Sequence, residues 1–201
     1  MTLRLPTRAS QLALLTISLL AGQPGLALGI EQVRTEFHEG EYRLSMTAML
    51  AAPIASVESV LRDYARYPQL DERILKAQVL TRVSATQVEL MTRINVCFSF
   101  WCRQVQRVER VDERPGELLA SVIPERSDAA RGSSHTLLSV QGAGTRVVYT
   151  TQIVPKFWVP ALLGRSLMLH SLREGTITLF ERIEQRAAQL PGRPPTTGER
   201  P

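Results

Sequence analysis

The sequence predicts an α+β domain in which an antiparallel sheet packs with one long C-terminal helix. Three features of the chain favour this fold class. An apolar stripe at helical spacing runs from Pro160 to Leu190, and strand-like segments joined by short turns occupy Ile74 to Val154. A helical segment that begins at Pro53 separates these strands from an earlier alternating segment. Helices and strands segregated along the chain in this way are typical of α+β domains.

The C-terminal segment is predicted to be a single amphipathic helix of about thirty residues, which spans roughly 45 Å. Pro160 suits a first helical position because its missing N–H costs nothing there, and Pro191-Gly192 ends the pattern. A helix of this length crosses a whole domain, so the strands before it could wrap around it. The residues on its apolar stripe are Leu162, Leu169, Leu172, Thr176, Leu179, Phe180, Ile183, Ala187 and Leu190.

Residues 1–29 are predicted to be a cleaved secretory signal. Arg4 and Arg8 precede an apolar run from Leu12 to Ala21, and Ala27-Leu28-Gly29 places small residues at the two positions that signal peptidase reads. A retained membrane anchor is the alternative, but the run is shorter than the ~20 residues that a bilayer requires. The protein would then be periplasmic or secreted, with one domain at 30–190 and a disordered tail, rich in Pro, Gly and Thr, at 191–201.

The charge of the chain argues against nucleic-acid binding. Arg4 and Arg8 account for two units of the formal net charge of +5, so removal of the signal leaves +3. The remaining Arg and Lys residues are spread among Glu and Asp, whereas a nucleic-acid interface needs a concentrated basic face.

The first part of the domain is predicted to contain strands followed by two short helices. The segment Val33–Leu50 alternates on either side of Glu39-Gly40, which predicts a hairpin or one long bulged strand. Helical spacing after Pro53 predicts a first helix, which Tyr67-Pro68 ends because a residue before proline disfavours helical backbone. A second short helix is predicted near Gln69 to Arg73.

Six further strands are predicted to form an antiparallel meander. Turns such as Ser84-Ala85 and Pro115-Gly116 are too short for parallel crossovers, which need a dozen or more residues. In the second of these strands apolar and polar residues alternate, so we expect one buried face and one face in water. The six segments are Leu75–Val83, Gln87–Val96, Arg103–Asp112, Glu117–Ile123, Ser133–Val140 and Thr145–Val154.

Short motifs at the junctions of these elements carry a family resemblance. They are Ala52-Pro53 with Val57, Leu61-Arg-Asp-Tyr64, Tyr67-Pro68 and Gly144-Thr-Arg-Val-Val-Tyr149. Together with the order of elements, they resemble the START-like, helix-grip superfamily, and within it the polyketide-cyclase and coenzyme-Q-binding branch. The resemblance implies a curved antiparallel sheet of about six to seven strands around the C-terminal helix. It also implies a hydrophobic cavity between sheet and helix that holds a lipid, quinone, sterol or polyketide-like ligand.

We expect the cavity wall to combine strand and helix residues. The candidates are Leu90, Thr92 and Ile94 from one strand, His135 and Tyr149 from two others, and Leu169, Leu172 and Thr176 from the helix. His135 has an alternative role as a hydrogen-bonded structural residue. Arg93 and Gln152 are further polar candidates for orienting a ligand, although each could instead face solvent.

Cys97 and Cys102 are predicted to form a disulfide. An oxidising compartment permits the bond, and adjacent strand ends would hold the two residues face to face across a four-residue loop. A metal site is disfavoured because two thiols without further ligands do not complete a tetrahedron. The spacing also differs from that of a Cys-x-x-Cys redox pair.

No catalytic constellation is found in the sequence. The histidines, His38, His135 and His170, lie on different predicted elements, and there is no Gly-x-Ser-x-Gly, His-Glu-x-x-His or phosphate-binding glycine loop. The sequence therefore favours a non-enzymatic protein that binds a hydrophobic ligand, without a metal or cofactor. The alternatives are an enzyme of the cyclase or dehydratase kind that uses the same cavity, and an interaction domain without a ligand.

Three loops are expected to meet at one end of the sheet, because successive tips of a meander alternate between its two ends. They are Phe98-Ser-Phe-Trp101, the long loop Pro124–Gly132 and Pro155-Lys-Phe-Trp-Val159. Trp and Phe beside cations such as Lys156 and Arg165 are typical of a contact with a membrane interface. We therefore predict a membrane-docking lip, and the alternative is that its aromatic side chains fold inward. Its residues are Phe98, Phe100, Trp101, Phe157, Trp158 and Leu163.

Overall fold

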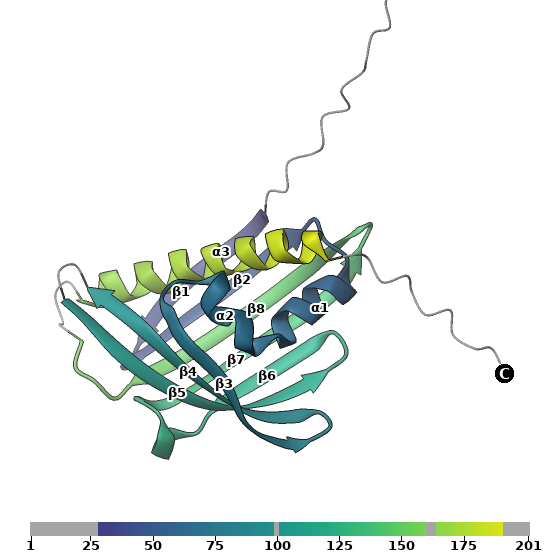
Figure 1. The fold of residues 1–201 in the computed structure, drawn as a ribbon. Helices are drawn as coiled ribbons and strands as arrows, with labels where there is room; N and C mark the ends of the chain where they lie inside the picture. Colours follow the sequence, from purple (N-terminus) through teal and green to yellow (C-terminus); the bar gives the residue numbers. More distant parts are fainter. Residues whose placement is uncertain (1–27, 99–100, 160–163, 191–201) are drawn as a thin grey trace, which may run out of the picture.

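A computed structural model describes residues 28–98, 101–159 and 164–190. Within these ranges eight strands form one antiparallel sheet in the order β1-β2-β8-β7-β6-β5-β4-β3, and the sheet curves around a long helix, α3 (Figure 1). This is the α+β, helix-grip architecture that the sequence predicts. The strands are β1 (Gly29–His38), β2 (Glu41–Leu50), β3 (Ile74–Ser84), β4 (Gln87–Phe98), β5 (Trp101–Arg114), β6 (Glu117–Val122), β7 (Ala129–Gln141) and β8 (Gly144–Pro155).

The helices lie before β3, between β6 and β7, and at the end of the domain. They are α1 (Ile54–Arg62), the 3₁₀ helix η1 (Tyr64–Arg66), α2 (Tyr67–Leu70), the 3₁₀ helix η2 (Pro124–Arg126) and α3 (Gly164–Gln189). No helix among the described residues is long and apolar enough to cross a membrane. The predicted signal, apart from its last residues, and the predicted tail lie outside the described ranges.

The opening segment forms a hairpin, which is one of the two possibilities that the sequence left open. Phe37 pairs with Tyr42 and His38 pairs with Glu41, so Glu39-Gly40 is a two-residue turn. Both turn residues have positive φ, 48° and 82°, which is the geometry that matches the twist of a hairpin. The extra strand is the reason why the sheet has eight strands instead of the six to seven expected.

The short helices differ from the prediction in their bounds. Pro68 lies in the first turn of α2, and Tyr67 before it is helical with φ −53° and ψ −37°, so Tyr67-Pro68 does not end the helical segment. Proline is tolerated there because the first N–H groups of a helix have no partner within it. The second short helix predicted near Gln69 to Arg73 is present as α2, but it ends at Leu70, because Asp71 is extended and its carboxylate accepts the N–H of Arg73 at 3.0 Å. This bond fixes the turn into β3.

The segment between β6 and β7 is more ordered than predicted. The expected long loop Pro124–Gly132 contains η2 and the start of β7. Side-chain oxygens hold this segment against β5: Ser127 Oγ accepts the N–H of Val108 at 2.8 Å, and Asp128 Oδ2 accepts that of Gln106 at 2.7 Å. The prediction of a loop was therefore wrong for its second half, since residues 129–132 belong to β7.

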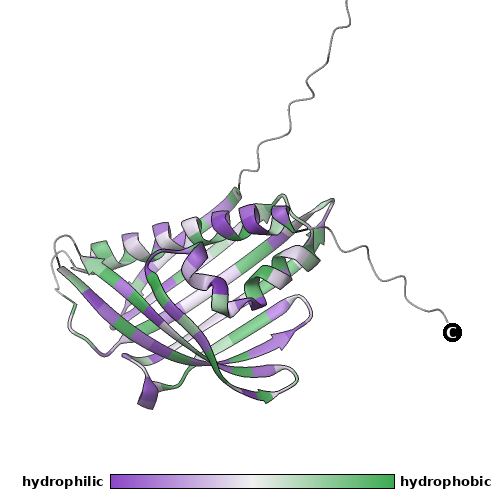
Figure 2. Ribbon diagram, viewed as in Figure 1, coloured by the Kyte–Doolittle hydropathy of each residue, from purple (hydrophilic) through white to green (hydrophobic). Residues whose placement is uncertain are grey.

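The core lies between the sheet, α1 and the C-terminal half of α3. Apolar and polar residues alternate along the strands, as Figure 2 shows. On β2 the buried residues are Tyr42, Leu44, Met46, Ala48 and Leu50, and on α3 they include Phe180, Ile183 and Ala187, as predicted. Glu184, one residue beyond Ile183, is also buried, which the sequence did not indicate; its Oε1 accepts the N–H of Ala51 at 2.6 Å.

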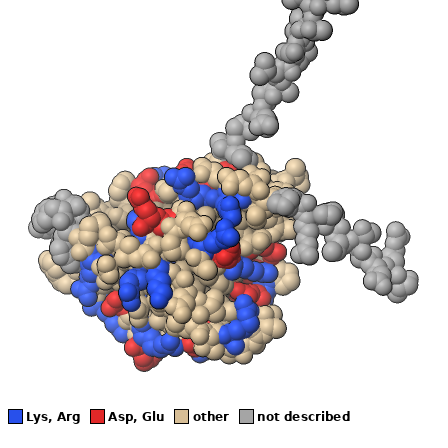
Figure 3. All heavy atoms as spheres, viewed as in Figure 1, with Lys and Arg blue, Asp and Glu red and all other residues tan. Residues whose placement is uncertain are grey.

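Charged side chains of both signs share the surface. On the face drawn in Figure 3, Lys and Arg are interspersed with Asp and Glu. Many of them form ion pairs, such as Arg126 with Glu89 at 2.7 Å and Arg146 with Glu31 at 3.2 Å. Exposed pairs of this kind contribute little to stability.

Candidate ligand site between the sheet and helix α3

Burial between the sheet and α3 differs between the two ends of the sheet, which we call the closed end, near α1, and the open end, near the β4–β5 tip. Near α1, the strand residues that face α3, here called inward, are fully covered: Leu50, Val88 and Val147 each have 0 % exposure. Along the same faces toward the β4–β5 tip, inward residues such as Ile94 and Ile153 are partly exposed. The helix follows the same gradient, since its second half is buried whereas its first half, with Leu169 and Leu172, is only partly buried.

Seven of the predicted cavity residues face this space. Leu90 and Thr92 on β4 are inward and buried, with 4 % and 2 % exposure, and Ile94 follows them toward the open end. On α3, Thr176 is buried, while Leu172 packs against the core from a partly exposed position. Tyr149 on β8 is inward, and its ring centroid lies 5.3 Å from that of Phe180; Leu169 belongs to the partly buried half of the helix. Their contact with a ligand stays a prediction.

His135 lies on the opposite face of the sheet, so its placement in the cavity wall was wrong. Its neighbours Thr136 and Leu138 are buried, and the alternation of strand side chains therefore directs His135 outward. There its Nε2 lies 2.8 Å from Glu117 Oε1, and it lines a hollow of about 350 Å³ on the outer surface. The candidates Arg93 and Gln152 are exposed on the same outer face.

The structure adds two charged residues to the inward face that sequence reasoning missed. Arg107 and Glu109 lie on β5 directly opposite Thr92 and Leu90 of β4. Residues opposite each other in an antiparallel pair point to the same face, so both charges face α3. Counting in steps of two from the buried Val111 would have reached them. Because charged side chains normally face solvent, the sequence alone suggests that both residues point outward.

Arg107 and Glu109 form an ion pair in which Glu109 is buried and the side chain of Arg107 is partly exposed, at 29 %. Glu109 is 3 % exposed, and its Oε2 lies 2.9 Å from Arg107 Nε. The Nε atom itself is covered. Burial lowers the pKa of the guanidinium and the charge of Glu109 raises it, with a net rise, so Arg107 stays charged.

Two phenols lie near this pair. Burial raises the pKa of both Tyr67 and Tyr149, while the charge of Arg107 acts in the opposite direction, so both phenols are neutral at ordinary pH. Tyr67 donates to the carbonyl oxygen of Leu61 at 2.6 Å, which orients its ring. We refer to Arg107, Glu109, Tyr67 and Tyr149 as the polar cluster; it can donate and accept hydrogen bonds.

Three segments meet at the open end, as predicted from the alternation of loops between the two ends of a meander. The N–H of Lys156 donates to the carbonyl of Asp128 at 2.9 Å, and its Nζ donates to that of Pro124 at 2.6 Å. The guanidinium of Arg103, near the start of β5, lies 5.3 Å from the ring centroid of Phe157. Trp158 is 77 % exposed. Phe100 and Leu163, and the side chains of Phe98 and Trp101, lie outside the described part of the chain.

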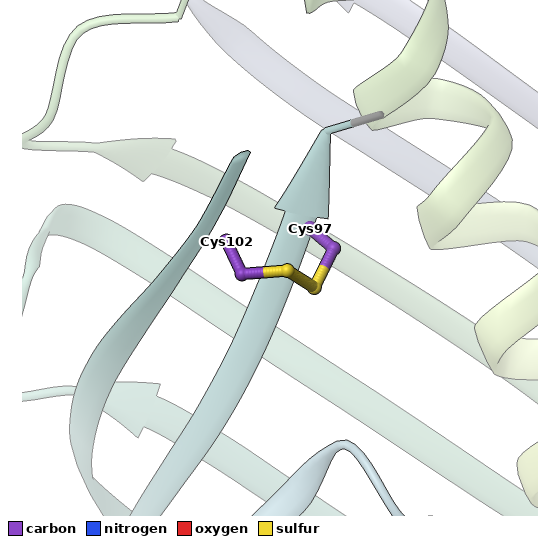
Figure 4. Close-up of a disulfide and its surroundings, with 2 residues drawn as sticks. All are labelled: Cys97 and Cys102. Carbon is purple, nitrogen blue, oxygen red and sulfur yellow. A yellow bond between two sulfur atoms is a disulfide. The ribbon is translucent and has the colours of Figure 1, made fainter. Parts of the chain in front are cut away.

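The predicted disulfide between Cys97 and Cys102 is confirmed (Figure 4). The two cysteines are directly opposite each other on β4 and β5, with Cα atoms 4.0 Å apart. Both are exposed, on the outer side of the hairpin that carries the open end. Among the described residues no group of three His, Cys, Asp or Glu side chains is arranged to hold a metal ion.

Comparison with solved structures identifies the fold. The chain is similar to a START superfamily protein from Mycobacterium smegmatis, with 19% identity and a TM-score of 0.54 over 71% of this chain and 97% of that one. It is also similar to the Zhui aromatase/cyclase from Streptomyces sp. R1128, with 16% identity and a TM-score of 0.60 over 73% and 93% of the two chains. A STAR-related lipid transfer protein from Xanthomonas axonopodis matches with 13% identity and a TM-score of 0.58 over 78% and 99%.

Sequence comparison adds no closer relative, since no family model and no curated protein matches the chain. The three solved structures include an aromatase/cyclase and a lipid transfer protein. In each case the match extends over nearly the whole of the solved structure's chain. Sheet order, helix position and these matches agree: the protein has the START-like, helix-grip fold.

Proposed function

We propose that the protein binds and carries a hydrophobic small molecule between its sheet and α3, in the periplasm or outside the cell. The observation that carries the proposal is the gradient of burial. Apolar side chains that face α3 are fully covered near α1 but stay partly exposed at Ile94, Ile153 and Leu172. Exposed apolar surface in a concave site favours an apolar ligand, because covering it removes that surface from water. The secretory signal predicted at residues 1–29 supports the location.

Native mass spectrometry after mild purification, followed by extraction and analysis of apolar molecules, tests the proposal. We expect one apolar molecule per chain. A chain that stays empty after purification and after incubation with lipid extracts would contradict carriage.

A second candidate function is catalysis of the cyclase or dehydratase kind in the same space. The observation that favours it is the polar cluster, because an ion pair with two neutral phenols could hold or move a proton on a bound ligand. Turnover of a polyketide-like substrate that is lost in Tyr149→Phe would support this alternative.

We further propose that the open end docks on a membrane, so that the ligand passes without crossing water. Trp158 is 77 % exposed, and the cations Arg103, Lys156 and Arg165 surround this end without an ion pair to any described residue. An exposed indole beside cations suits the interface of an anionic bilayer.

Flotation with liposomes of neutral and of anionic phospholipid tests the docking. We expect the protein to float with anionic liposomes and Trp158→Ser to float less. Val140→Ser is the matched control, because Val140 is 68 % exposed but lies next to the β7–β8 turn, at the other end of the sheet. Equal flotation of both variants, or no flotation of the native protein, would contradict membrane docking through the open end.

A further inference from the structure

A groove on the surface of the closed end lies outside the proposed ligand site. It is formed by the second half of α3 and by the short helices before β3, where α1 runs beside α3 (Figure 1). Its volume is about 250 Å³, and none of its described lining residues belongs to the sheet. The proposed ligand site, in contrast, lies between the sheet and the first half of α3, so the groove is a separate feature of the molecule.

The groove carries a positive charge. Three arginines and one aspartate line it, which leaves a formal charge of +2. The aspartate, Asp63, is already paired, because its carboxylate lies 3.0 Å from the guanidinium of Arg66. The other two arginines, Arg182 and Arg186, form no ion pair with any described residue. Arg182 donates only to the amide oxygen of Gln185, at 3.3 Å, among the described residues.

The spacing of these two arginines favours an anion in the groove. Arg182 and Arg186 are one turn apart on the same face of α3, where like charges repel each other, and an anion between them removes this repulsion. A guanidinium can bind a carboxylate through two parallel hydrogen bonds. Arg186, in the last turn of α3, also suits the helix dipole. The dipole does not account for Arg182, because its effect is confined to the last turn.

The other lining residues indicate which kind of anion fits. The buried side chains of Val60 and Leu70 supply apolar surface, and three glutamines line the walls. A glutamine amide both donates and accepts hydrogen bonds, as the backbone of a peptide does, whereas a simple anion such as phosphate needs donors alone. The wall from Arg182 to Gln189 extends over roughly 10 Å at the rise of an α-helix, about the length of three residues of extended chain.

We propose that this groove binds an acidic peptide segment of a partner protein. A Glu or Asp side chain of the segment lies against Arg182 and Arg186, and an apolar side chain lies against Val60 and Leu70. A membrane surface fits less well, because none of the large apolar side chains that are exposed on the described chain lines the groove. Since the groove is at the closed end, a partner bound there leaves the open end free to exchange ligand.

Fluorescence anisotropy of labelled peptides tests the proposal on the native protein. The probes are peptides of equal length with the repeats Glu-Glu-Leu, Gln-Gln-Leu and Lys-Lys-Leu, each with the same neutral dye. We expect the acidic peptide to bind about tenfold more tightly than the neutral one, and the basic peptide not to bind. Raising the salt from about 50 mM to about 300 mM should weaken the binding, because salt screens exposed charges. This comparison needs no variant, so it does not depend on how a substitution affects folding.

Double variants assign the binding to the groove. Arg182→Gln with Arg186→Gln removes both unpaired charges and should weaken binding of the acidic peptide about tenfold. The matched control is Arg34→Gln with Arg93→Gln, which removes the same charge from exposed positions on the outer face of the sheet. The control should keep the affinity within about twofold, because charges beyond the screening length contribute little. Circular dichroism confirms that each variant is folded.

The remaining outcomes would overturn the proposal. Equal affinity for the acidic and the neutral peptide, no binding of any peptide, or equal losses in the two folded double variants would show that the groove does not recognise an acidic segment. Displacement of the acidic peptide by inorganic phosphate at constant ionic strength would assign the groove to a simple anion. Displacement by phosphatidylglycerol vesicles would assign it to a membrane surface. None of these outcomes bears on carriage, because the groove does not line the proposed ligand site.

Discussion

Two carboxylates inside the domain, Glu184 and Glu109, have different kinds of partner. Glu184 is 1 % exposed and accepts the backbone N–H of Ala51, which connects α3 to the junction between β2 and α1. Glu109 has the guanidinium of Arg107 instead. A backbone partner is fixed by the fold and points to a structural role, whereas a side-chain pair that faces an open space can serve a ligand.

The first prediction concerns Glu184. Glu184→Leu should lower the free energy of unfolding by about 1–3 kcal/mol, because the N–H of Ala51 then lacks an acceptor. Glu184→Gln keeps an acceptor oxygen and should cost less. Urea denaturation measures both, with the exposed Glu181→Gln as control. A leucine variant as stable as the native protein would mean that this bond contributes nothing.

The second prediction concerns pH and Asp71. Burial raises the pKa of this carboxyl, but the hydrogen bonds and charge of Arg73 outweigh burial and hold it below its ordinary value of 3.8. A lowered folded pKa means stability that is present above the ordinary value and is lost as the pH falls through the folded one. The stability difference between native protein and Asp71→Asn should therefore shrink between about pH 5 and about pH 2. A difference that stays constant over this range would show that the ion pair with Arg73 does not stabilise the fold.

At the scale of elements, periodicity predicted the strands well because each has one buried face. Gln87–Val96 and Thr145–Val154 were predicted within two residues of β4 and β8. Predictions from local sequence failed where tertiary contacts determine the backbone conformation. The hydroxyl of Tyr67, which is helical before Pro68, donates to the carbonyl oxygen of Leu61, and β5 supplies donors for the side chains of Ser127 and Asp128 just before β7. The partners of Ser127 and Asp128 lie about twenty residues away in sequence, so no local pattern reveals them.

The candidate site shows the same limit. Apolar residues such as Leu90 and Leu172 could be predicted, because hydrophobic periodicity marks the buried face of each element. The inward direction of Arg107 and Glu109 was not predicted, because a charge on an alternating strand normally marks the solvent face. His135 was placed on the wrong face because a polar strand gives no clear alternation: residues 133 to 136 are all Ser, His or Thr.

The third prediction concerns the β4–β5 hairpin. The intact mass of the purified protein should be two hydrogen atoms below that of the reduced form, and the denatured, unreduced protein should resist alkylation. Replacing Cys97 and Cys102 together by serine should cost about 2 kcal/mol, because the closed loop is short and little chain entropy is at stake. Free thiols in the unreduced protein, or a far larger loss of stability, would contradict this account.

At the scale of the whole molecule, one end of α3 stabilises the fold, and the other end lies at the proposed ligand site. The second half of α3 packs against α1 and the closed end of the sheet, with Phe180, Ile183 and Ala187 at 2 %, 1 % and 0 % exposure. The first half covers the open end with partly buried side chains. Arg73 connects α3 to the start of β3 between these halves: its guanidinium is 3.3 Å from the carbonyl oxygen of Ser171 and lies against Gly175, where a Cβ would displace it.

The last prediction tests this division with two truncations on α3. Phe180→Ala removes a fully packed ring and should cost about 3–5 kcal/mol, whereas Leu172→Ala should cost about half of the ~2–5 kcal/mol typical of a buried leucine. The cost at Leu172 is smaller because its surroundings are already partly open. For ligand content the order should reverse: Leu172→Ala, still folded, should lose more of the co-purified molecule than its stability loss explains. Thermal unfolding and extraction of the same samples measure both quantities. A large fall in melting temperature for Leu172→Ala with unchanged ligand content would show that the first half of α3 belongs to the core.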